Sequence, residues 1–131
     1  MRWLVVVVAL FLMSSGSLLA HHQFASEFDA SKKVTLKGKI VEMQWVNPHS
    51  WLHIDVTGPD GKVVRWALEF GIPRTLIRQG WRKEDLPAGA IVTVEGFLAK
   101  NGTNTANANK VILADGRELF AGSSYGGDGQ K

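Results

Sequence analysis

The sequence contains no cysteine, and this absence removes three kinds of chemistry together. A chain without thiols forms no disulfides, no thiolate metal site and no cysteine nucleophile. Its stability must therefore come from packing. A chain of 131 residues is long enough for one domain with a hydrophobic core.

Strong charge of either sign is also lacking, since the formal net charge is +3. The lysines and arginines are spread along the chain and form no basic helix or stripe, the usual electrostatic footprint of nucleic-acid binding. We therefore expect no nucleic-acid partner. A phosphate-binding glycine-rich loop and a Gly-x-Ser-x-Gly nucleophile elbow are absent from the sequence as well.

One long hydrophobic run is present, close to the N-terminus. Arg2 precedes the unbroken apolar run Trp3 to Met13, and small residues lead from there to Ala20. This is the layout of a secretory signal peptide, whereas a membrane-spanning helix needs about 20 apolar residues. The sequence predicts that residues 1–20 are an export signal and that no stable membrane insertion follows its removal.

Hydrophobic patterning divides the rest of the chain into a polar lead-in over 21–33, a β-rich domain over 34–120 and a disordered tail over 121–131. Strands are predicted at 34–46, 50–57, 63–70, 91–98 and 108–113. A short helix is predicted over 73–79, between the third and fourth strands, with Gly80 suited to its end.

Three strands, a helix and two strands follow one another in the OB-fold, a five-stranded Greek-key barrel. The sequence therefore predicts an all-β fold with one short helix, an OB-fold-like small barrel after the signal peptide. On that fold the ligand surface is the face of strands 2 and 3, flanked by loops that here correspond to 46–49 and 100–107. Fold alone carries no function, so the residues on this face have to be considered individually.

The turn Gly58-Pro59-Asp60-Gly61 joins the second and third predicted strands into a hairpin. Counting outward by twos from this turn predicts three pairs on the outer face: Asp55 with Arg65, His53 with Ala67, and Trp51 with Glu69. The positions between them are apolar and face the interior. In the first strand, the apolar positions change parity after Gly38, which predicts a β-bulge.

Candidate ligand-binding residues lie where the second strand begins and the third ends: Asn47, His49, Trp51, His53 and Glu69. Imidazole and carboxylate groups together suit a divalent metal ion, or a proton held at near-neutral pH. The alternative is structural. The Asn-Pro-His segment would then orient the second strand, and His53 and Glu69 would be ordinary solvated strand residues.

Trp51 is the tryptophan that the predicted register leaves on the polar face. An outward aromatic ring beside Glu69 is suited to stacking on a ligand. Cover by the N-terminal segment or by the 100–107 loop would explain the same position equally well.

His21 and His22 would begin the exported chain if the signal is removed after Ala20. A free α-amine with the imidazole of the first residue can chelate Cu(II), and a second histidine completes the set. The sequence therefore allows copper or zinc binding through His21 and His22, with His49 as a further candidate metal ligand. Solvated terminal histidines are the structural alternative.

Several short motifs together resemble a domain-of-unknown-function family of small exported proteins from Gram-negative bacteria. The motifs are His21-His22-x-Phe24, Trp45-x-Asn47-Pro48-His49-x-Trp51, Trp66-x-x-Glu69-x-Gly71, Val92-x-Val94-x-Gly96 and Asp115-Gly116-Arg117. The resemblance extends over nearly all of 21–124 and implies a periplasmic OB-like barrel without an established activity. His53 stands where an aromatic residue is common, which leaves His49 and Glu69 as the better site candidates.

Three hypotheses for function follow. The first is a non-enzymatic periplasmic binding module, whose outer hairpin face contacts a small ligand or a periplasmic protein. The second is a copper- or zinc-binding protein that uses the terminal histidines. The third is a small hydrolase or isomerase in which His49 and Glu69 form an acid/base pair.

Overall fold

The computed structural model describes residues 24–122. The predicted export signal, the histidine pair at 21–22 and nearly all of the predicted tail lie outside these residues. The strands are β1 (Phe28–Gln44), β2 (Trp51–Thr57), β3 (Val63–Glu69), β4 (Ile91–Ala99), β5 (Thr105–Ile112) and β6 (Glu118–Phe120). Helix α2 (Pro73–Arg78) and the single-turn 3-10 helix η1 (Lys83–Asp85) connect β3 to β4.

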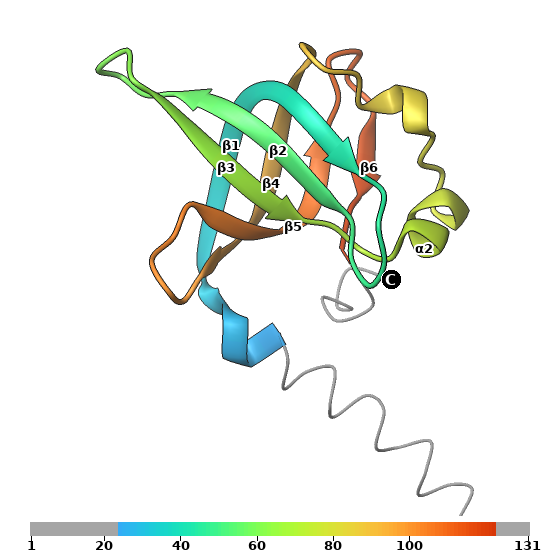
Figure 1. The fold of residues 1–131 in the computed structure, drawn as a ribbon, viewed down its shortest axis with the longest axis horizontal. Helices are drawn as coiled ribbons and strands as arrows, with labels where there is room; N and C mark the ends of the chain where they lie inside the picture. The colour runs from blue at the N-terminus through green and yellow to red at the C-terminus, as the bar shows by residue number, and fades with distance from the viewer. Residues whose placement is uncertain (1–23, 123–131) are drawn as a thin grey trace, which may run out of the picture.

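The strands form one sheet that closes into a barrel (Figure 1). β1 pairs antiparallel with β2 and with β4, and antiparallel pairs also join β2 to β3 and β4 to β5. A parallel pairing of β3 with the start of β5 closes the ring, and β6 pairs with the end of β5. This strand order, with α2 between β3 and β4, is that of the OB-fold, so the predicted fold class is confirmed.

The register of the β2–β3 hairpin is the predicted one. Trp51 pairs with Glu69, His53 with Ala67, and Asp55 with Arg65, whose guanidinium donates two hydrogen bonds to the Asp55 carboxylate. The alternate positions near the barrel centre are fully buried, whereas those near the turn are partly or largely exposed. The positions near the turn are exposed because the tip of the hairpin projects beyond the barrel (Figure 1).

Two glycines allow the strands to approach closely where the barrel bends. The predicted bulge in β1 is present, because the pairing with β2 shifts between Ile40 and Glu42. A Cβ added to Gly38 would lie 2.7 Å from the Asp55 carbonyl oxygen of β2. A second shift separates Glu95 from Gly96 in β4, and a Cβ on Gly96 would overlap the carbonyl of β5 that faces it. Side chains are thus excluded at two positions next to register shifts, where neighbouring strands approach closely.

Trp81 fills the interior at the α2 end of the barrel. Its side chain is 1% exposed and its ring lies 5.7 Å from that of Phe70. The indole N–H donates a hydrogen bond of 2.8 Å to the Phe120 carbonyl, which ties the helical connection to β6. Helix α2 begins at Pro73, close to prediction, and buries Leu76 against the same core.

The ordered barrel is longer than the sequence predicts at both ends. β1 begins at Phe28 rather than at 34, and β5 begins at Thr105 inside the loop predicted over 100–107. Ala121 is fully buried, its N–H donates to the Asn109 carbonyl, and its own carbonyl accepts from Gly71. These residues therefore belong to the barrel and not to a lead-in, a loop or a tail.

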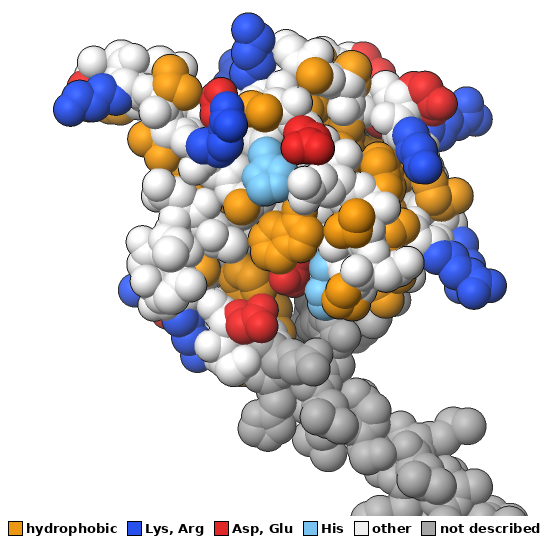
Figure 2. All heavy atoms as spheres, in the orientation of Figure 1, with side chains coloured by type: hydrophobic (Ala, Val, Ile, Leu, Met, Phe, Trp, Pro, Cys, Tyr) orange, Lys and Arg blue, Asp and Glu red, His pale blue; other side chains and the backbone are white. Residues whose placement is uncertain are grey.

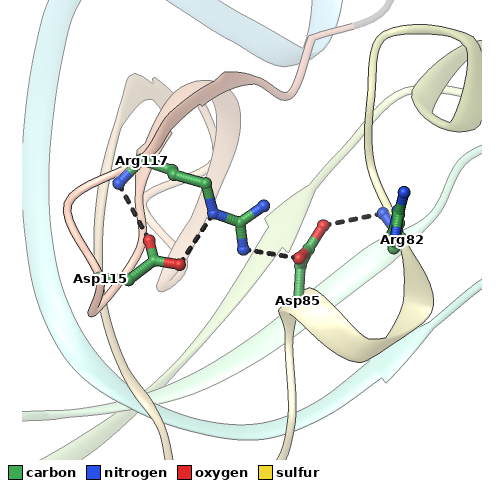
Figure 3. Close-up of polar contacts among 4 residues, drawn as sticks. All are labelled: Arg82, Asp85, Asp115 and Arg117. Atoms are coloured by element: carbon green, nitrogen blue, oxygen red, sulfur yellow. Dashed lines mark hydrogen bonds and ion pairs between the residues drawn. The ribbon is translucent and has the colours of Figure 1, made fainter.

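A polar cluster links η1 to the β5–β6 turn (Figure 3). Arg117 donates from Nη2 to the Asp85 carboxylate at 2.8 Å and from Nε to Asp115 at 2.8 Å. The Arg82 backbone N–H donates to the other Asp85 oxygen. Burial acts to raise the pKa of Asp85, but the hydrogen bonds from Arg117 and Arg82 outweigh it, and the pKa is lowered.

We expect Asp85→Asn to lower the free energy of unfolding by about 1 kcal/mol at neutral pH, because a largely buried charged acceptor is lost while its partner stays half-exposed. The folded-state pKa is depressed, so the stabilisation is present above the ordinary value of 3.8 and is lost as pH falls below it. Urea unfolding at neutral pH and near about pH 3 measures both effects. Asp60→Asn in the exposed hairpin turn is the control, and an equal loss there would contradict the assignment.

Candidate functional site

A row of outer-face residues crosses five strands at one level of the barrel. Gln44 of β1 pairs with Trp51 of β2, which pairs with Glu69 of β3. Glu69 pairs with Asn107 of β5, and Asn107 with Phe97 of β4. Side chains directly opposite one another on one face of a sheet lie in contact range. Closure of the barrel therefore brings the predicted pair of Trp51 and Glu69 next to Asn107 and Phe97, whose strands are distant in the sequence.

A pocket of 330 Å³ lies over this row. The described residues that line it come from the start of the chain, from the loop before β2 and from the β2–β3 face: Phe24, Glu27, Phe28, Pro48, His49, Trp51 and Glu69. Three of them are aromatic, two are acidic, and none is lysine or arginine. In Figure 2, histidine, acidic and hydrophobic side chains gather at the middle of the displayed face, and most basic side chains lie around its outline.

The start of the described chain forms one wall of the pocket. Residues 24–27 form a helical turn that leads into β1. The Phe24 ring lies 5.8 Å from Phe28 and 5.8 Å from Phe97, edge-on to the latter. Lys100, just after β4, donates its backbone N–H to the Glu27 carbonyl at 2.9 Å and its ammonium group to the Ala25 carbonyl. The cover over Trp51 is thus the N-terminal segment, one of the two alternatives that the sequence allows.

Glu69 is buried, with 7% of its surface exposed, so the expectation of an ordinary solvated strand residue is wrong for it. The side-chain amide of Asn107 donates a 3.1 Å hydrogen bond to its Oε1. Burial raises the pKa of the Glu69 carboxyl, since a desolvated carboxylate is disfavoured. The charge of His49 and the hydrogen bond from Asn107 act to lower this pKa. The charge of Glu27 acts to raise it further.

We expect Glu69→Gln to raise the free energy of unfolding by about 1 kcal/mol at about pH 8, because glutamine removes a desolvated charge and keeps an oxygen for Asn107. The folded-state pKa of Glu69 lies above the ordinary value of 4.5. The wild type therefore loses stability as pH rises from 4.5 through the folded-state pKa. The advantage of the variant should therefore shrink toward zero near about pH 4.5.

Urea unfolding of wild type and Glu69→Gln across this pH range measures the difference. Glu84→Gln, an exposed position of η1, is the matched control and should stay within about 0.5 kcal/mol of wild type. A Glu69→Gln variant that is less stable than wild type at the higher pH would contradict the assignment of a destabilised carboxylate.

The remaining predicted site residues divide between the pocket and the surface beside it. His49 is half-buried and lines the pocket near Glu69. Asn47 is exposed in the loop before β2, where its peptide bond to Pro48 is cis. His53 lies on the outer face opposite Glu42 of β1, outside the pocket lining.

Ser50 holds His49 and Trp51 in place on the rim. Its backbone N–H donates to the Gly71 carbonyl at 3.0 Å, and its carbonyl accepts from Phe70 at 2.8 Å. These bonds continue the β2–β3 pairing past Trp51. The Ser50 side chain is fully buried, so its hydroxyl is not presented to the pocket.

Sequence reasoning missed Asn107, which donates to Glu69, and the pocket residues from outside the hairpin: Phe24, Glu27, Phe28 and Pro48. Asn107 was expected in a loop, although Thr105 and Asn107 continue the alternation of β5 and signal an earlier start of that strand. Phe24 contacts the ring of Phe28 and that of Phe97 in β4, so these aromatic residues attach the start of the described chain to the barrel. No local sequence pattern indicates that these aromatic residues line a pocket.

Within residues 24–122, no three histidine or acidic side chains come close enough together to hold a metal ion. His49 therefore has no complete metal site among the described residues. His21 and His22 lie outside them, and copper or zinc binding through the terminal pair stays a prediction. In the same part of the chain, no helix combines the length and apolar character needed to span a membrane.

Comparison with known proteins supports the family resemblance. A family model described as "Family of unknown function (DUF6152)" matches residues 9–108. No curated protein matches the chain. Crystal structures of Rim1, the mitochondrial single-stranded DNA-binding protein of S. cerevisiae, are similar at 19% identity, with TM-scores of 0.47 and 0.48. The match covers 63% of this chain and 93% or 92% of those chains.

The N-terminal domain of PriB from Thermoanaerobacter tencongensis is a further similar structure. It shares 16% identity with a TM-score of 0.39, and the match covers 64% of this chain and 97% of that chain. At such identities the likeness concerns the fold alone.

The expectation of no nucleic-acid partner is corrected by these matches. The similar structures include single-stranded DNA-binding proteins, so evenly spread charge does not justify excluding nucleic acid for a barrel of this kind. The physical reason is that OB-folds contact single strands through aromatic side chains and a local groove, and neither shows in the net charge. Nucleic acid is therefore no longer excluded as a partner, and no ligand is identified by these matches.

Proposed function

Because the chain belongs to the Family of unknown function (DUF6152), whose description carries no activity, we propose a function from the pocket itself. The protein is a non-enzymatic binding module of the periplasm that takes a small molecule into the pocket over Glu69. The observation that carries this proposal is a buried carboxylate that opens into a 330 Å³ space lined by aromatic rings. A pocket with apolar walls and a few convergent polar groups is the usual form of a small-ligand site.

The framework around the pocket supports binding. Trp51 and Glu69 stand on paired strands, and Asn107 from the closing strand holds the carboxylate. Strand-borne groups with fixed partners are preorganised, which reduces the entropy lost when a ligand binds. Keeping a desolvated carboxylate at this position also favours a functional role, because a neutral side chain would be more stable there.

Binding is favoured over the acid/base alternative by the side chains that reach the pocket. His49 and Glu69 both line the pocket, as that alternative requires, but the Ser50 hydroxyl next to His49 in sequence is buried in the barrel. A substrate in the pocket would therefore meet no serine nucleophile from Ser50. The pocket offers charge, hydrogen bonding and ring surface.

The experiment is a ligand-observed NMR screen of small molecules of each charge type against the processed protein, with a single-stranded oligonucleotide as a further sample. We expect ligands with Kd of about 10 μM to 1 mM, whose binding falls at least about 10-fold in Trp51→Ala. His53→Ala, on the same face outside the pocket, should bind as wild type does. A screen in which no small molecule depends on Trp51, or in which the oligonucleotide alone binds, would overturn the proposal.

A further inference from the structure

Carboxylates outnumber imidazoles among the described residues that line the pocket. Two carboxylates, Glu27 and Glu69, line it together with the imidazole of His49. Asn107, a neutral amide, donates a hydrogen bond to Glu69, and the charge of His49 also acts on this carboxyl. A buried carboxylate is stabilised much more by a cation than by a neutral donor. The pocket thus favours a ligand that brings positive charge and N–H donors.

Aromatic rings surround the same space. Trp51 forms one wall, and Phe24 and Phe28 form the wall contributed by the start of the chain. The face of an aromatic ring attracts a cation within about 6 Å, and indole does so most strongly. Carboxylate and ring faces together are the chemistry that recognises an organic ammonium ion. An anionic ligand such as a phosphate would be repelled by both carboxylates.

The volume limits the size of that ion. A pocket of 330 Å³ is at the lower end of the range for small-molecule sites, about 300–1,000 Å³. It accommodates one ammonium group on a short apolar body. We propose that the ligand of this site is a small organic ammonium ion, with Glu69 as its counter-ion and Trp51 as its ring contact. This inference rests on the proposed binding function and narrows its ligand class.

The test compares three probes that share one ring and differ in charge: benzylamine, benzyl alcohol and benzoate. Calorimetry is run at low salt, so that screening does not hide a charge preference, and at about pH 8, where the amine of the probe is protonated. Wild type should bind benzylamine at least about 10-fold more tightly than benzyl alcohol, and benzoate most weakly. Glu69→Gln should reduce the preference for the amine to below about 3-fold and leave benzyl alcohol unchanged. Glu84→Gln should retain the full preference.

The outcomes separate this inference from the proposed function. Equal binding of benzylamine and benzyl alcohol, lost in Trp51→Ala, would overturn the ammonium assignment and leave a binding pocket for neutral molecules. Preferential binding of benzoate would overturn it as well. If none of the three probes binds at up to about 10 mM, the ammonium assignment fails, and the function fails too if the NMR screen found no pocket ligand.

A lysine side chain of a partner protein would present the same ammonium group on a longer chain. N-acetyl-lysine amide is therefore the fourth probe. Tighter binding of this probe than of benzylamine would place the ligand on a protein and overturn the small-molecule assignment.

Discussion

Gly96→Ala should lower the free energy of unfolding by about 3 kcal/mol, at the upper end of the range for overpacking a well-packed interior. Gly96 sits at the register shift between β4 and β5. An added Cβ would overlap the Asn107 carbonyl and lie 3.2 Å from the Cα of Ala108. Both neighbours are backbone, so the conflict is relieved only if β5 moves away from β4.

The same movement should reach the pocket, because Asn107 donates the hydrogen bond that holds Glu69. Urea unfolding measures the stability, and amide hydrogen exchange across β5 measures the local loosening. Gly58→Ala is the matched control, since its Cβ would meet the end of the Asp60 side chain at 3.0 Å, which can rotate away. A loss below about 1 kcal/mol in Gly96→Ala, or an equal loss in both variants, would contradict the close strand approach.

Trp81→Ala should be the most damaging single truncation, with a loss of about 3–5 kcal/mol in the free energy of unfolding. The side chain is 1% exposed and packs against Phe70 at the end of the barrel. Its removal leaves a large cavity and a Phe120 carbonyl without its indole donor. Chemical denaturation followed by far-ultraviolet circular dichroism measures the loss without relying on tryptophan fluorescence.

Trp51→Ala is the variant with which Trp81→Ala is compared, because it truncates a tryptophan outside the core. Trp51 is half-buried on the outer face and lines the pocket, so its truncation should lower the free energy of unfolding by no more than about 1.5 kcal/mol. If Trp81→Ala does not fold, Trp81→Phe keeps most of the ring packing and tests the lost hydrogen bond. A larger loss for Trp51→Ala than for Trp81→Ala would show that the assignments of core and site are reversed.

The hairpin shows how far local sequence information reaches. The turn over 58–61 sets the register, and the alternation of apolar residues independently agrees with it, so the pairing of Trp51 with Glu69 is predictable. Both signals act within a few residues of the positions they determine. The bulge in β1 is predictable for the same reason, because the parity change and Gly38 are adjacent.

The burial of Glu69 shows where such information ends. An alternating strand pattern indicates which face a side chain occupies, and it carries no information about what covers that face. Glu69 is covered because it pairs in parallel with Asn107, which is 38 residues away in the sequence. The packing of Phe24 on Phe97 of β4 adds to this cover. The ends of the fold were missed similarly, since Ala121 is held by bonds to Asn109 and Gly71.

The sequence by itself determined that this is a small β-barrel with a helix after its third strand. It also determined that Trp51 and Glu69 share one outer face, since turn geometry and strand alternation are short-range properties. Only the tertiary structure decided that this face is a pocket. The desolvation of Glu69 and the aromatic walls arise when the barrel closes and residues 24–28 pack across its outer face. No residue acquires that environment from its neighbours in sequence.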